Sequence, residues 1–70
     1  MTLGDWLRER RAVAGLRIRE CAQECGVGRA AWTAWESGTA MPGTHRAAGI
    51  ARALGVTAEE VHARLSEVRS

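Results

Sequence analysis

The chain has 70 residues, of which 46% are apolar and 26% charged, and its formal net charge is +2. A chain of this length forms one small domain, residues 1–70, and leaves no room for a buried catalytic cleft. Its apolar runs are too short to span a membrane and its first residues lack the apolar stretch of a secretory signal, so we expect a cytoplasmic protein.

Five short helices and no strands are predicted along the chain, so the expected fold class is all-α. The predicted ranges are 3–14, 17–25, 29–37, 44–54 and about 57–68. A glycine follows each of the first four helices, as expected for left-handed helix caps. Thr2 with Asp5, and Thr57 with Glu60, have the spacing of reciprocal caps at helix starts. Pro42 and Gly43 mark the only long loop.

Apolar residues recur at helical spacing in every predicted helix, which indicates one buried stripe for each. Trp6 lies beside the first stripe rather than in it, so we expect it to be half exposed. Two cysteines, Cys21 and Cys25, are predicted to be buried thiols, because a zinc site would need His45 and His62 as well. The stripes are Leu3, Leu7 and Ala14; Ile18, Cys21, Ala22 and Cys25; Trp32 and Trp35; Ile50, Ala51 and Leu54; and Val61, Leu65 and Val68.

The stretch from Ile18 to Gly38 has the spacing of a helix-turn-helix motif. Ala22 is small where the second helix of the motif crosses the first, and Gly26 suits the turn between them. Val27, Trp32 and Trp35 then hold the second helix against the core. This places Arg29, Ala30, Thr33 and Ala34 on its outward side, where a recognition helix meets the major groove.

Three segments, GLRIRECAQECGV, WTAWESGTAMP and IARALGVTAEEV, resemble the Cro and phage-repressor (XRE) type of helix-turn-helix family, over about Leu3 to Leu65. The resemblance implies a compact five-helix fold like that of lambda repressor and binding to double-stranded DNA. It also implies an ion pair between Arg11 and Glu36 that ties the first helix to the recognition helix. The alternative is that both are solvated surface charges.

The sequence departs from the family where bases are read. Ile18 stands where the family usually has glutamine, and Gly28 where it usually has serine or threonine. Three positions that are usually polar are Ala30, Ala31 and Ala34. Direct hydrogen-bond readout is therefore expected to be sparse, and phosphate contacts and DNA shape must supply the remaining affinity.

Arg29 is the only long donor on the outward side of the recognition helix, and it suits a bidentate contact to guanine. Ala30, Ala34 and the Thr33 methyl group suit contacts with thymine methyl groups. The predicted phosphate contacts are Arg17, Ile18, Arg19, Ser37, Thr39, Thr44 and Arg46.

We expect a transcriptional regulator, a repressor of the phage or prophage kind, that binds a palindromic operator as a homodimer. Leu65 and Val68 are the expected dimer contacts, because little chain remains to cover them. The alternative is a protein-interaction module, such as an antitoxin or anti-regulator, that keeps the fold and has lost base reading. No nucleophile, paired carboxylate or metal cluster is evident, so neither enzyme activity nor a cofactor, metal or small-molecule ligand is expected.

Overall fold

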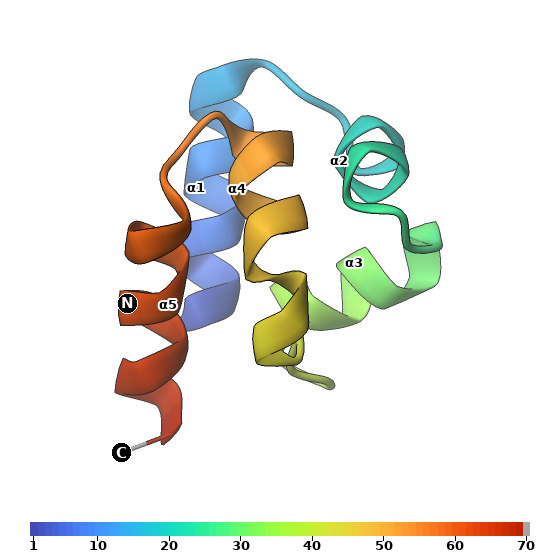
Figure 1. Ribbon diagram of the computed structural model, residues 1–70. Helices are drawn as coiled ribbons and strands as arrows, with labels where there is room; N and C mark the ends of the chain where they lie inside the picture. Colours follow the sequence, from blue (N-terminus) through green and yellow to red (C-terminus); the bar gives the residue numbers. More distant parts are fainter. Residues whose placement is uncertain (70) are drawn as a thin grey trace.

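The computed structural model describes the backbone of residues 1–69 and the side chains of residues 1–67. Within them the chain forms five α-helices joined by short turns, with no strand (Figure 1). The all-α prediction is therefore confirmed. The elements are α1 (Leu3–Ala14), α2 (Ile18–Cys25), α3 (Arg29–Ser37), a 3-10 turn η1 (Thr44–Arg46), α4 (Ala47–Leu54) and α5 (Ala58–Arg69).

The helix ends follow the predicted caps. The Thr2 hydroxyl accepts a hydrogen bond from the Asp5 N–H at 3.1 Å, and the Asp5 carboxylate accepts one from the Thr2 N–H at 3.2 Å. Thr57 accepts from the Glu60 N–H at 3.1 Å in the same way. The four glycines that end α1 to α4 all have positive φ, between 70° and 82°.

Three predicted helix starts are shifted in the structure. Arg17 is extended and caps α2 instead of opening it, because its N–H donates to the Glu20 carboxylate at 2.9 Å. The helix expected from Thr44 is a 3-10 turn as far as Arg46, and the α-helix begins at Ala47. Tight turns of this kind are common at helix N-termini. Thr57 precedes α5 as its cap, and the helix begins at Ala58.

Helix α4 stands between α2 and α5, with α1 alongside and α3 crossing near one end (Figure 1). Its Ile50 is fully buried in a hydrophobic core to which Leu7, Trp32 and Val61 also belong, each from another helix. As predicted, Trp32 and Trp35 are core residues, and their ring centroids lie 5.5 Å apart. Cys21 and Cys25 are buried free thiols, also as predicted, and burial raises the pKa of each.

Three expectations about burial were wrong. Trp6 is only 4% exposed, because α5 packs against α1 and brings the Arg64 guanidinium to 5.5 Å from the indole centroid. Ala14, at the last turn of α1, is exposed. Leu65 is 1% exposed and belongs to the core of its own chain, so it does not lie uncovered. The side chain of Val68 lies outside the described residues.

Candidate nucleic-acid interface

Helices α2 and α3 form a helix-turn-helix pair. The turn is closed by the Val27 N–H, which donates to the Ala22 carbonyl at 2.9 Å. Gly26 takes the left-handed conformation there, with φ of 80°, which other residues adopt only at a cost. The Ala22 side chain is buried, and α2 and α3 pack against each other. The turn therefore fixes α3 across α2.

The outward side of α3 carries a shallow depression that is lined by seven of the predicted DNA-contacting residues. Arg29, Ala30 and Thr33 are exposed, and Ala34 is half-buried. Ile18 reaches this depression from the start of α2. All four predicted base-reading residues thus lie together with three of the predicted phosphate contacts. The lining is Ile18, Arg29, Ala30, Thr33, Ala34, Ser37 and Thr39.

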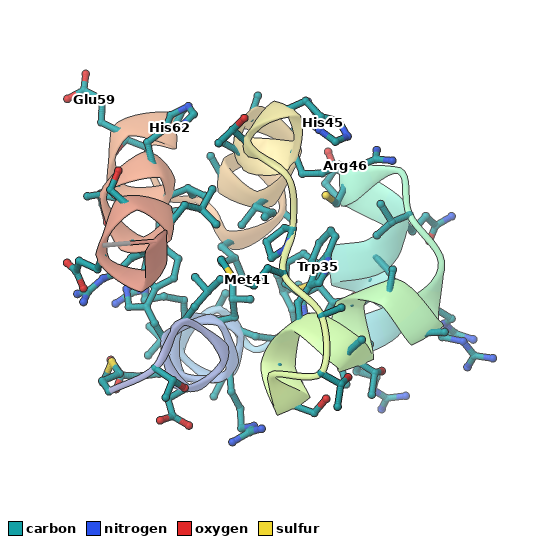
Figure 2. All side chains as sticks on the ribbon, turned by 90° about the horizontal axis from the view of Figure 1, so that it is seen from below. Trp35, Met41, His45, Arg46, Glu59 and His62 are labelled. Atoms are coloured by element: carbon teal, nitrogen blue, oxygen red, sulfur yellow. The ribbon has the colours of Figure 1, made fainter. Side chains whose placement is uncertain are left out.

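The other predicted phosphate contacts lie elsewhere on the surface. Arg17 and Arg19 line a second hollow, at the start of α2. Thr44 and Arg46 belong to η1 and line neither of these two hollows. Figure 2 shows Arg46 at the start of α4, on the side toward α2. Burial raises the pKa of the Cys25 thiol, and the nearby charge of Arg46 partly opposes that effect.

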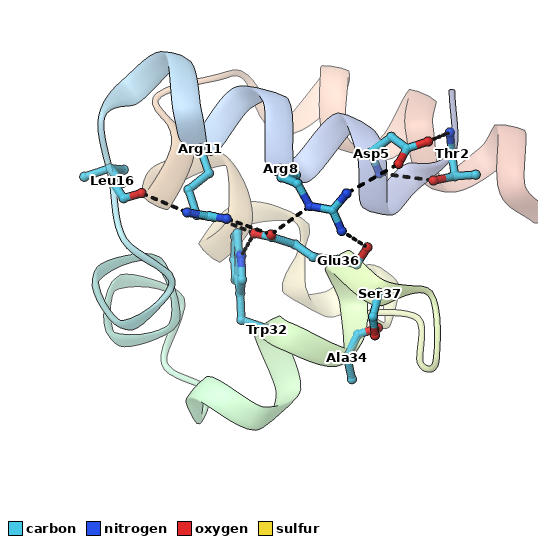
Figure 3. Close-up of polar contacts among 9 residues, drawn as sticks. All are labelled: Thr2, Asp5, Arg8, Arg11, Leu16, Trp32, Ala34, Glu36 and Ser37. Carbon is cyan, nitrogen blue, oxygen red and sulfur yellow. Dashed lines mark hydrogen bonds and ion pairs between the residues drawn. The ribbon is translucent and has the colours of Figure 1, made fainter.

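The last turn of α3 is anchored by the Glu36 carboxylate, whose side chain is only 4% exposed (Figure 3). Arg11 on α1 donates to it through Nε at 2.7 Å and through Nη2 at 3.0 Å. The Trp32 indole N–H donates to the same carboxylate at 2.6 Å. The hydrogen bond to Glu36 raises the pKa of Arg11. The two charges are therefore paired and largely removed from solvent.

Two further residues of α1 hold α3, and neither was predicted from the sequence. Arg8 donates through Nη2 to the Glu36 carbonyl oxygen at 3.2 Å. Gly4 packs so closely that a Cβ atom there would overlap this oxygen and lie 3.0 Å from the Trp35 carbonyl oxygen. The sequence does contain a signal for this contact: Gly4 lies inside a predicted helix, where glycine is unfavourable. Gly4, Arg8 and Arg11 are spaced i, i+4 and i+7, which places them on one side of that helix.

Helix α2 is anchored to α4 by contacts that were also missed. Arg52 donates to the Glu24 carboxylate at 3.1 Å and to the Glu24 carbonyl oxygen at 3.0 Å. Gly49 lies against Cys25, where an added Cβ atom would be 3.0 Å from the sulfur. Both helices of the motif are therefore tied to the rest of the bundle.

Helices α2 and α3 form a helix-turn-helix motif whose second helix presents its outward side to solvent. The protein is therefore of the helix-turn-helix class. The sequence profile of the helix-turn-helix domain family matches residues 2–64, so the chain belongs to that family, in its XRE-like group. Membership places it among DNA-binding regulators. A search of curated protein sequences finds no match. Among the described residues no helix has the length and apolar character needed to cross a bilayer.

Proposed function

We propose that this protein is a sequence-specific regulator of transcription that inserts α3 into the major groove of double-stranded DNA. The observation that carries the proposal is the depression where Arg29, Ala30, Thr33 and Ala34 meet on one accessible side of α3. Arg29 stands in the first turn of the helix, and the N-terminal residues of a recognition helix contact base edges. Its guanidinium suits the two acceptors of guanine.

The phosphate backbone is contacted by residues of this depression and by residues elsewhere on the surface. Arginine exceeds acidic residues by eight to five in the first 52 positions, so this part of the chain attracts a polyanion. Contacts of this kind orient the protein and carry no sequence information. The assigned phosphate contacts are Arg17, Ile18, Arg19, Ser37, Thr39, Thr44 and Arg46.

The finer assignment is a phage or prophage type of repressor that binds a palindromic operator as a homodimer. One α3 of nine residues with a single long donor reads few bases. Two copies on half-sites one helical turn apart multiply this modest specificity. The dimer contact does not rest on Leu65, whose side chain is already buried within its own chain.

A second candidate function is a protein-interaction module, such as an antitoxin, with weak or no base reading. It is favoured by the mostly apolar surface of the depression, which Ile18, Ala30 and Ala34 supply. The two candidates differ in a simple outcome. A regulator enriches particular duplexes from a random pool, whereas an interaction module enriches none.

The experiment is enrichment of bound duplexes from a random library, followed by titration of the enriched and a scrambled duplex at one salt concentration. A two-fold symmetric consensus supports paired half-sites. The Arg29→Ala variant should lose about 1–3 kcal/mol on the enriched duplex and little on the scrambled one.

The matched control is Arg19→Ala, which removes an assigned phosphate contact and should weaken binding to both duplexes alike. An equal loss on both duplexes for Arg29→Ala would make Arg29 a phosphate contact. Enrichment of no duplex would contradict the regulator itself.

A further inference from the structure

The hydroxyl groups at the C-terminal end of α3 form hydrogen bonds with the backbone of the same helix. The Ser37 hydroxyl donates to the Ala34 carbonyl oxygen at 3.2 Å, and Figure 3 shows Ser37 against Ala34. The Thr39 hydroxyl lies 3.1 Å from the Ser37 hydroxyl and 3.4 Å from the same carbonyl oxygen. These two side chains therefore offer the depression less hydrogen-bonding capacity than their sequence suggests.

The rest of the depression is mainly apolar. Ile18 forms one side of it and is half-buried, because it also packs on the hydrophobic core. Ala30 and Ala34 supply methyl groups from α3. Of the seven lining residues, only Arg29 and Thr33 bring polar side-chain groups that make no hydrogen bond within the described part of the chain.

Apolar groups are scarce on the edges of base pairs. In the major groove the C5-methyl group of a pyrimidine is the one apolar feature, carried by thymine and by 5-methylcytosine. A hollow formed by Ile18 and alanine side chains matches that group in chemistry, and its free hydrogen-bond donors are confined to Arg29 and Thr33. Arg29, in the same hollow, brings the positive charge that holds it against DNA.

We infer that the depression between Ile18 and α3 is a binding site for pyrimidine C5-methyl groups in the major groove. The inference rests on the proposed function and adds the chemical class that α3 recognises. Ile18 is then a specificity residue rather than a phosphate contact. Arg29 reads a neighbouring base pair at the edge of the same site.

The test replaces each thymine of an enriched duplex, one at a time, by deoxyuridine, which removes only the methyl group. Replacement of a contacted thymine should lower the affinity for the duplex about four-fold, which is the change in equilibrium constant expected for one buried methyl group. A second arm replaces the contacted pair by C·G with or without 5-methylation. Recovery of affinity on methylation shows that 5-methylcytosine is also accepted, and no recovery restricts the site to thymine.

The protein arm compares Ile18→Ala with Gln23→Ala, an exposed position of α2 outside the depression. The ratio of thymine to uracil affinity should fall toward one for Ile18→Ala and stay unchanged for Gln23→Ala. This ratio is measured within each variant, so partial loss of folded protein affects both duplexes equally. Tight binding with equal affinity for thymine and uracil at every position overturns the inference. Failure of the proposed function looks different, because no duplex is then enriched.

Discussion

Glu36 is a buried carboxylate that holds the last turn of α3 against α1. A buried carboxylate is costly unless charged or polar donors satisfy it. Here the donors are Arg11 from α1 and the Trp32 indole from one turn earlier in α3. The carboxylate therefore links the first helix to the recognition helix and to the tryptophan core at the same point.

We predict strong coupling between Arg11 and Glu36 in a double-mutant cycle of Arg11→Met and Glu36→Gln, measured by urea unfolding. Each single change leaves a largely buried charge without its closest counter-ion, and Arg8, whose Nε lies 3.7 Å from the Glu36 carboxylate, is too exposed to replace Arg11. The coupling energy should therefore be about 2 kcal/mol. The control is the pair Arg52 and Glu24, whose side chains are 59% and 54% exposed. Its coupling should stay below about 1 kcal/mol. Equal coupling energies for the two pairs would show that burial of Glu36 adds nothing.

The start of α1 lies so close to the end of α3 that there is no room for a side chain at Gly4. We predict that Gly4→Ala lowers the free energy of unfolding by about 1–3 kcal/mol, because the new methyl group meets backbone atoms of Glu36. Helix propensity alone would give the opposite sign. Urea unfolding measures the change.

The matched control lies at the other end of α3. Gly28 caps that helix without a side-chain hydrogen bond and has open space around it. Gly28→Ser should therefore be neutral or stabilise the fold by a few tenths of a kcal/mol. A Gly4→Ala variant as stable as Gly28→Ser would contradict the close approach of α1 to α3.

The helices could be predicted from sequence because their signals are local. Caps such as Thr2 with Asp5, and glycines such as Gly26, act within one turn of the chain. The burial of Trp6 and Leu65 could not be predicted in this way. It depends on how α5 docks on α1 and α4, and the periodicity of one helix does not contain that information.

Two ion pairs connect the helix-turn-helix pair to the rest of the helical bundle. Glu36 joins α3 to α1, while Arg52 joins α4 to α2. The two helices are thus held by different parts of the bundle (Figure 1). Such support keeps the outward side of α3 in a fixed position, as reading base edges requires.

The residues of the candidate site could be predicted from the motif, because its spacing decides which side of α3 faces outward. The chemistry of the site could be predicted only in part. The Ser37 hydroxyl bonds back to the Ala34 carbonyl oxygen within α3. The Thr39 hydroxyl comes near the same oxygen because the chain turns back at Gly38, where φ is 82°. The spacing of the motif does not show whether these hydroxyls face their own backbone or the DNA.

Amide NMR shifts of the protein titrated with an enriched duplex show whether α3 is the DNA-contacting element. We predict that the largest changes fall on Arg29, Ala30 and Thr33. Glu59 and His62 lie on α5, at the opposite edge of the molecule in Figure 2, and should be unaffected. Changes confined to α5, with α3 unperturbed at saturating DNA, would show that α3 does not contact DNA.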